Sequence, residues 1–190
     1  VRALSEVGRA VSSTLDLETV LTTIVSRANQ LLGTDAGAIF EYDESAEEFL
    51  LRATQNMEEE AVEALRQTRL RKGEGAVGRV AVTREPVQIP DILDEGAYRS
   101  GVRDVLVRSG YRALLAVPLL REDHILGALG VIRKAPGEFS ADVIDLLTTF
   151  ATQSALAIQN ARLFREIEDK GRQLEIASQH KSQFLANMSH

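Results

Sequence analysis

The sequence predicts an α+β fold in which an antiparallel sheet is preceded and followed by helices. Two observations predict this class. Short apolar runs are joined in pairs by tight polar turns, which is typical of β-hairpins. Longer segments near both ends carry apolar residues three and four positions apart, the spacing of an amphipathic helix.

Two helices are expected before the sheet. Apolar residues at helical spacing predict a short linker helix within residues 1–13. A second helix should begin after Asp16, whose carboxylate can cap the first turn, and end at Gly33. Its broad apolar stripe consists of Leu17, Val20, Leu21, Ile24, Val25, Ala28, Leu31 and Leu32.

The middle of the chain supplies the strands. Residues 37–42 and 49–54 predict one hairpin, and residues 113–120 and 124–133 predict another. The elements expected between the hairpins are a charged helix over residues 57–71, a glycine-punctuated turn into a short helix, a brief strand over 87–89 and a polar stretch over 91–110.

A long helix should follow the sheet. Ser140 can cap it, and no proline interrupts the helical pattern before the end of the chain. If residues 141–190 are helical throughout, they extend for about 75 Å, whereas a compact domain of about 130 residues is only about 35 to 40 Å across. The helix should therefore project beyond the domain. Its outer half carries a weak apolar seam, which predicts pairing in a homodimer; a single frayed tail is the alternative.

Composition excludes several classes of protein. The 190 residues include no cysteine, 5% are aromatic and the formal net charge is −6. Without cysteine there is no disulfide, thiolate-bound metal, thiol nucleophile or thioether-linked chromophore. The apolar runs are too short for a membrane helix, and an acidic chain with few aromatic residues is not expected to bind nucleic acid.

The motifs that could carry chemistry are weak. Residues 73–78 match the dinucleotide-binding pattern G-x-G-x-x-G, but the residues before them are charged rather than a buried strand, and no parallel βαβ unit follows. His124, His180 and His190 lack metal-ligand spacing. We therefore expect no metal site and no catalytic residue within this segment.

Four sequence matches, in order along the chain, resemble the GAF domain family. They are GEGAVGRV at 73–80, REPVQIPD at 84–91, LAVPL at 115–119 and ILGALGVI at 125–132. The resemblance covers about residues 14–165 and implies an antiparallel sheet of five or six strands. It also implies helices on one face that bundle with those of a partner, and a small-molecule pocket on the other face. The glycine-rich segment and residues 91–110 would cover that pocket.

The end of the chain carries a second resemblance. Residues 181–190, KSQFLANMSH, resemble the opening of the dimerisation and phosphoacceptor helix of sensor histidine kinases, and His190 matches the phosphoaccepting histidine. This implies a parent kinase that uses ATP and magnesium to phosphorylate His190 and then passes the phosphoryl group to the receiver domain of a response regulator. Because the segment lacks an ATP-binding domain, it should be inactive alone.

The GAF resemblance also narrows the ligand. Covalent bilin needs a cysteine, and haem needs an axial ligand that His124, in a turn, is poorly placed to supply. The cyclic-nucleotide subgroup has an Asn-Lys pair, a Phe and a later Asp-Glu pair. The matching positions here hold Arg133-Lys134, Phe139 and Val143-Ile144, so two of the three elements depart from the pattern.

An unidentified small molecule or no ligand at all remains. The polar candidates for ligand contact are Asp91, Tyr98, Arg99 and Tyr111, for which the alternative is a role as surface loop residues. No cofactor is expected within the segment.

We expect a cytoplasmic sensory GAF module over residues 14–165, followed by a signalling helix and the start of the phosphoacceptor helix over 166–190. Two rival hypotheses remain. One is a ligand-free GAF scaffold for dimerisation or protein interaction. The other, an independent enzyme such as a free sulfoxide reductase, is disfavoured because that chemistry would want cysteines.

Overall fold

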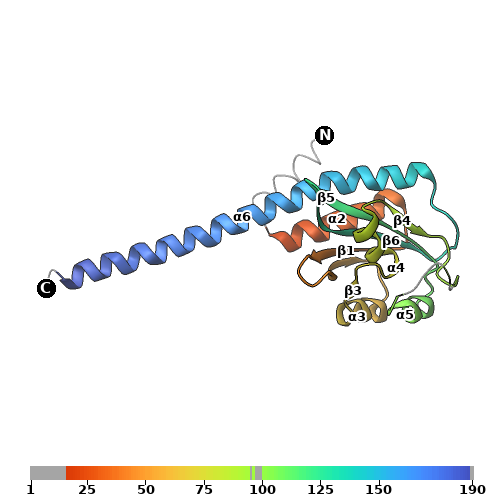
Figure 1. Ribbon diagram of the computed structural model, residues 1–190, viewed down its shortest axis with the longest axis horizontal. Coiled ribbons are helices and arrows are strands. Elements are labelled where there is room, and N and C mark those ends of the chain that lie inside the picture. Colours follow the sequence, from red (N-terminus) through yellow and green to blue (C-terminus); the bar gives the residue numbers. More distant parts are fainter. Residues whose placement is uncertain (1–15, 95, 97–99, 189–190) are drawn as a thin grey trace.

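A computed structural model of the chain describes residues 16–94, 96 and 100–188, with the side chains of the final helix described as far as residue 175. These residues form an antiparallel sheet with helices on both faces (Figure 1). In chain order the elements are α2 (Leu17–Leu32), β1 (Ala36–Asp43), β2 (Glu48–Gln55), α3 (Glu59–Gln67), β3 (Leu70–Arg71), α4 (Gly75–Thr83), β4 (Val87–Ile89), α5 (Arg103–Arg108), β5 (Ala113–Arg121), β6 (His124–Arg133) and α6 (Ala141–Met188).

The sheet has six strands in the order β3-β2-β1-β6-β5-β4, and every neighbouring pair is antiparallel. The two predicted hairpins, β1–β2 and β5–β6, are confirmed. They meet where β1 pairs with β6, from Ala36 opposite Ile132 to Glu41 opposite Gly127. The centre of the sheet therefore joins strands that lie far apart in the sequence.

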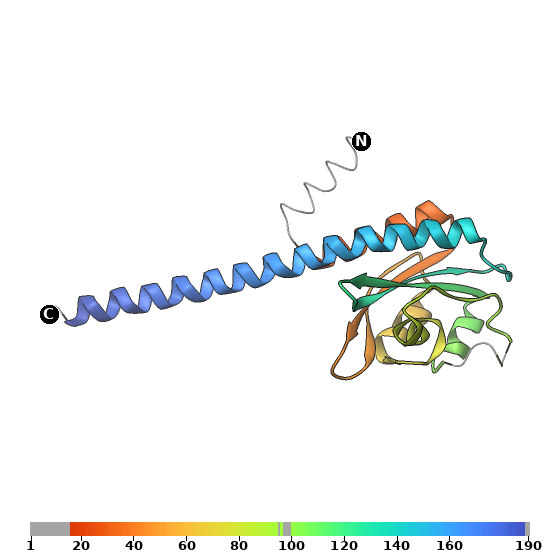
Figure 2. The same ribbon diagram turned by 45° about the horizontal axis from the view of Figure 1, so that its top comes forward.

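The two long helices α2 and α6 lie antiparallel on one face of the sheet (Figure 2). Asp16 caps α2 as predicted, because its carboxylate accepts the Glu18 N–H at 3.1 Å, and Gly33 ends the helix with a φ of 65°. The apolar stripes of both helices pack against side chains from the central strands. Among the buried members of this core are Val25, Ile39, Leu115, Leu129, Leu147 and Ile158.

Three short helices, α3, α4 and α5, cover the opposite face. They enclose a second core whose buried members include Phe40, Phe49, Leu65, Ile89, Ile92 and Tyr111. Successive residues of each central strand point to opposite faces of the sheet, so one strand contributes to both cores. In β1, for example, Ile39 belongs to the helix-side core and Phe40 to the other.

Some expectations from the sequence were wrong in detail. The predicted helix over residues 57–71 is shorter: α3 ends at Gln67, and Leu70 lies in β3, where it pairs with Phe49 and is buried. The polar stretch over 91–110 contains α5, which was not predicted. In α2 the apolar stripe narrows at its end, since Leu31 is 50% exposed.

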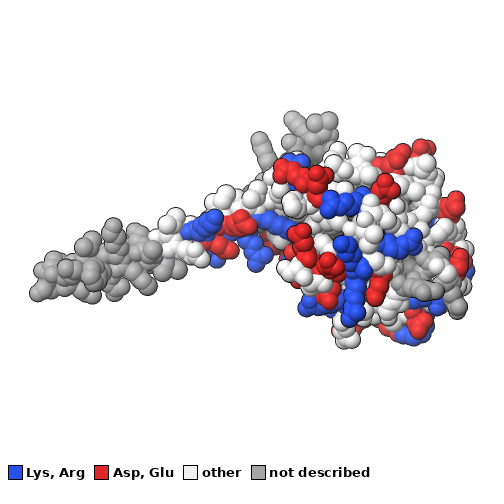
Figure 3. All heavy atoms as spheres, in the orientation of Figure 1, with Lys and Arg blue, Asp and Glu red and all other residues white. Residues whose placement is uncertain are grey.

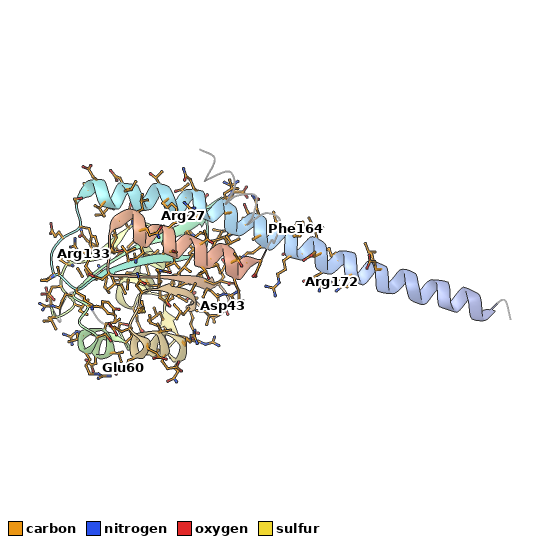
Figure 4. All side chains as sticks on the ribbon, turned by 180° about the vertical axis from the view of Figure 1, so that it is seen from behind. Arg27, Asp43, Glu60, Arg133, Phe164 and Arg172 are labelled. Carbon is orange, nitrogen blue, oxygen red and sulfur yellow. The ribbon has the colours of Figure 1, made fainter. Side chains whose placement is uncertain are left out.

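The long final helix is confirmed over the described residues. The Ser140 hydroxyl accepts the N–H of Val143 at 3.2 Å, and α6 then runs through Gly171 to Met188. Ala161 is its last buried residue within the described part, whereas Ile167 and Leu174 are 66% and 71% exposed. Figure 4 labels Phe164 where α6 passes the start of α2, and Arg172 farther out, clear of the sheet.

No helix within the described residues is both long enough and apolar enough to cross a membrane. On the face shown in Figure 3, acidic and basic side chains are intermingled rather than gathered into a basic stripe. The predicted linker helix within residues 1–13 lies outside the described residues, and pairing of α6 with a second copy stays a prediction.

Candidate functional site

A mostly apolar cavity lies between the sheet and its three short helices. Its empty volume is about 490 Å³, part of which is open solvent. Strands β1, β5 and β6 form the floor, and α3, α4, α5 and the segment before α5 form the walls. Among the described lining residues only Glu74 and Ser100 have polar side chains. Such a lining suits a small molecule that is largely apolar.

Small residues at facing positions create the hollow. Ala38 on β1 pairs with Gly130 on β6, which pairs in turn with Ala116 on β5. This row of small residues crosses three strands and lies on the cavity floor. A Cβ added at Gly130 would meet no neighbouring atom closer than 3.8 Å, so a small side chain fits there in ordinary van der Waals contact.

The glycine-rich segment forms one wall, and backbone geometry explains its glycines. Gly73 and Gly75 have positive φ values of 92° and 64°, which few other residues adopt without strain. At Gly78 a Cβ would lie 2.1 Å from the carbonyl oxygen of Arg71. The segment is thus a tight turn into α4, as predicted, and all pairings of the sheet are antiparallel, unlike those of a dinucleotide-binding unit.

Asp91 anchors the segment that follows β4. Its carboxylate accepts hydrogen bonds from Nε and an Nη of Arg112 at 3.0 and 2.8 Å, and from the N–H of Leu93 at 3.0 Å. The Arg112 hydrogen bond, aided by that of Leu93, lowers the pKa of Asp91 to about 2. Asp91 is not among the residues that line the cavity. Its predicted contact with a ligand stays a prediction.

Tyr111 lies in the cavity-side core and is 1% exposed. Its hydroxyl accepts the N–H of Glu58 at 2.9 Å at the start of α3, and burial raises the pKa of the phenol. Tyr111 therefore stabilises the start of α3, which forms part of the cavity wall, but is not among the lining residues. The other two ligand candidates, Tyr98 and Arg99, lie outside the described residues.

Asp91 and Tyr111, the two ligand candidates among the described residues, are thus engaged with other parts of the chain and are not among the residues that line the cavity. The lining residues Ala38, Ala116 and Gly130 were not predicted from the sequence. Nor was Arg103, whose guanidinium donates to the carbonyl oxygens of Ile92 and Leu93 at 2.9 and 3.3 Å. The sequence does show small residues within these three strands. They predict a cavity floor only once the register that places them side by side is known.

His124 lies at a second, polar hollow formed by the ends of the two hairpins and of α4. Four charged side chains line this hollow together with His124: Glu44, Glu47, Lys72 and Arg84. In the part of the chain that the structure describes, no three His, Cys, Asp or Glu side chains gather in a way that could hold a metal ion.

Two polar contacts tie α6 to the sheet near its last buried turn. Arg121, at the end of β5, donates from Nε to the side-chain oxygen of Gln159 at 2.8 Å. Three residues on, Arg162 lies 3.3 Å from a carboxylate oxygen of Glu41 on β1. His190, the predicted phosphoacceptor, lies outside the described residues.

Comparison with known proteins identifies the family. The family model "GAF domain" matches residues 16–158. The chain belongs to the GAF domain family. A GAF domain is a regulatory or sensory module, and this chain has the GAF fold, with its six-stranded antiparallel sheet, helices and long C-terminal helix.

Relatives of this GAF domain occur in several kinds of protein. The chain is 23% identical over 183 residues to the Caenorhabditis elegans protein named "Probable 3',5'-cyclic phosphodiesterase pde-5", covering 92% of this chain and 25% of that protein. The chain thus spans a quarter of that relative's length.

Two solved structures share the GAF fold. One is the GAF domain of a phosphoenolpyruvate-protein phosphotransferase from Coxiella burnetii, with 26% identity, a TM-score of 0.68 and coverage of 85% of this chain and 95% of that one. The other is a domain of a protein assigned as a two-component sensor histidine kinase from Sinorhizobium meliloti, with 20% identity, a TM-score of 0.63 and coverage of 77% and 93%. The second similarity shows the fold alone.

Proposed function

We propose that this GAF domain is the sensory module of a sensor histidine kinase and that α6 connects its cavity to a phosphoaccepting His190. One observation carries the proposal. The helix α6 starts on the sheet at Ala141 and continues without a break to Met188, within the motif of residues 181–190. A rigid helix of this length can pass a rotation or a shift from one end to the other.

In the parent protein, ATP would supply the phosphoryl group and magnesium would neutralise the charge that develops on it. A neutral imidazole nitrogen of His190 would accept the γ-phosphoryl group, with ADP as the leaving product. The receiver domain of a response regulator would then take the phosphoryl group from His190. The chain of 190 residues would contribute the sensor and the acceptor but no ATP site, and would act in the cytoplasm.

The lining of the cavity favours a small apolar ligand over a cyclic nucleotide. The described lining contains no Lys, Arg or His that could pair with a phosphate, and its one ionisable side chain is the acidic Glu74. The nearby basic groups of Arg103 and Arg112 are engaged with backbone carbonyls and with Asp91. Ligand binding would act by favouring one of two arrangements of α6.

A homodimer would complete the signalling unit. Three apolar side chains of α6, Leu163, Ile167 and Leu174, are 50%, 66% and 71% exposed. They are four and seven positions apart, as on one seam of a coiled coil, and a second copy would bury them. A ligand-free dimerisation scaffold would use the same helix; a ligand-dependent rise in thermal stability distinguishes the sensor from the scaffold.

The decisive test is phosphorylation of the full-length natural protein that contains this segment. Incubation with γ-labelled ATP and magnesium should give a phosphate that is labile in acid and stable in base. The His190→Gln variant should lose the label, whereas the control variant His180→Gln should keep it. Absence of label, or label that survives His190→Gln, would overturn the proposal. The chain of residues 1–190 alone should stay unlabelled.

A further inference from the structure

Two adjacent residues of β1 connect the cavity with the output helix. Phe40 is 4% exposed and lines the cavity, while the next residue, Glu41, points to the other face of the sheet. There its carboxylate oxygens lie 3.3 Å from an Nη of Arg162 on α6 and 3.5 Å from an Nη of Arg52 on β2. All three charged side chains are about one-third exposed or less.

The ion pair between Glu41 and Arg162 lies at the end of the buried part of α6. Arg162 directly follows Ala161, the last buried residue of the helix in the described part of the chain. Beyond this point the described part of α6 has no further buried residue; the helix first passes the start of α2 and then projects from the domain. A change in the contact at Arg162 therefore acts at the end of the buried part of α6, shortly before the helix leaves the domain.

The backbone around Glu41 leaves little freedom for β1 to absorb a displacement. Glu41 pairs with Gly127 of β6, where an added Cβ would lie 1.9 Å from the carbonyl oxygen of Phe40. On the other side of β1, the register with β2 shifts between Ile39 and Phe40, as in a β-bulge. Because packed interiors transmit strain instead of yielding continuously, a movement of Phe40 should move Glu41 with it.

We propose that the Glu41–Arg162 ion pair is the contact through which occupancy of the cavity changes the exit of α6. This rests on the proposed sensory function and names its regulatory link. The other polar tie, Arg121 to Gln159, is a less suitable link, because neither Arg121 nor its neighbour Leu120 lines the cavity. If the ion pair is this link, the cavity and α6 are energetically coupled through Glu41, and a double-mutant cycle measures that coupling.

A side chain built into the cavity can replace the unidentified ligand. Gly130→Val places two methyl groups at the cavity floor, because Gly130 lines the cavity and an added Cβ meets no atom closer than 3.8 Å. Hydrogen exchange of the backbone amides in α6 around residues 155–170 is then measured in the chain of 190 residues. We expect Gly130→Val to change this exchange by about 2- to 30-fold, the range that typical couplings produce.

The Glu41→Gln substitution should abolish that response, leaving less than about a twofold change on addition of Gly130→Val. The matched control is Glu48→Gln, which removes an ion pair to Arg69 elsewhere on the same hairpin and should leave the response intact. If Gly130→Val prevents folding, as judged by circular dichroism, Gly130→Ala is used with the same criteria.

Two results would overturn the proposal. One is exchange in α6 that does not respond to the filled cavity at all. The other is a response of the same size with and without Glu41→Gln, which would leave the ion pair a purely structural role. Neither measurement uses ATP or His190, so the outcome is independent of the phosphorylation test.

Discussion

The two faces of the sheet are covered in opposite ways. On one face, α2 and α6 are long, both begin with a side-chain cap, and their stripes close over the sheet. On the other face, α3, α4 and α5 have 9, 9 and 6 residues and no side-chain cap, and they leave a cavity. The sheet with α2 and α6 is therefore a tightly packed unit, called the frame below. The other face leaves space for a small molecule.

The short helices of the cavity face depend on contacts made elsewhere in the chain. Helices of this length are marginal by themselves. The Tyr111 hydroxyl holds the start of α3, and Arg103 at the start of α5 holds the carbonyl oxygens of Ile92 and Leu93. The difference between the closely packed face with the long helices and the cavity face with the short helices leads to four predictions about the stability of the fold.

The largest effect should come from two glycines of β6 that face opposite sides. Gly127→Val should cost about 4 kcal/mol or more, because its Cβ would lie 1.9 Å from the Phe40 carbonyl oxygen. Gly130→Val, on the cavity side, should change the free energy of unfolding by less than about 1 kcal/mol, since space is available there. Urea denaturation measures both, and equal losses would show that the cavity floor cannot accommodate a larger side chain at position 130.

Removal of a buried leucine should also distinguish the two cores. Leu147→Ala on α6 empties a fully buried site and should cost about 3 to 5 kcal/mol. Leu114→Ala widens a cavity that already exists and should cost about 2 to 3 kcal/mol, the low end of the range for such a change. The measurement is again the free energy of unfolding. A larger loss for Leu114→Ala would contradict the division between frame and cavity.

The helix caps should give a smaller difference. Asp16→Ala removes the hydrogen bonds to the Glu18 N–H and the Thr19 hydroxyl, and should cost about 1 kcal/mol. Glu74→Ala at the start of α4 should cost less than about 0.5 kcal/mol, because Glu74 makes no side-chain cap bond. Asp16→Asn, which can still cap, should retain most of the stability in thermal unfolding.

The smallest effect should appear only in acid. The pKa of Asp91 is lowered from 3.8 to about 2, so its pair with Arg112 stabilises the fold above about pH 4 and is lost as the pH falls toward 2. Stability should therefore decline less steeply between pH 4 and 2 in Asp91→Asn than in the unsubstituted chain. Asp104→Asn, at a side chain that is 86% exposed, is the control and should keep the original slope. Parallel declines in all three chains would contradict the prediction.

Local signals in the sequence predicted most of the frame. Asp16, Gly33 and Ser140 act within one helical turn of themselves, and each delimits a helix where the spacing of apolar residues predicted it. The hairpins were predicted for the same reason, because their turns join neighbouring segments. The strand β3 and the helix α5 were missed, since both are short and are held by distant partners.

The candidate site was predicted only in outline. Asp91 and Tyr111 are not among the residues that line the cavity, and each is engaged with a partner that the sequence does not reveal, Arg112 for one and the Glu58 N–H for the other. The carboxylate of Asp91 and the ring of Tyr111 therefore support the wall rather than form its surface. Their contact with a ligand stays a prediction.

By itself, the sequence determined the class of fold, the start of both long helices and the end of α2, the exclusion of cysteine chemistry and the motif that ends in His190. Each depends on residue type or on spacing within a few positions. Only the tertiary structure decided that Ala38, Ala116 and Gly130 form one cavity floor and that Glu41 meets Arg162. Those contacts depend on the register between strands and on the packing of α6, which join residues that no local signal relates.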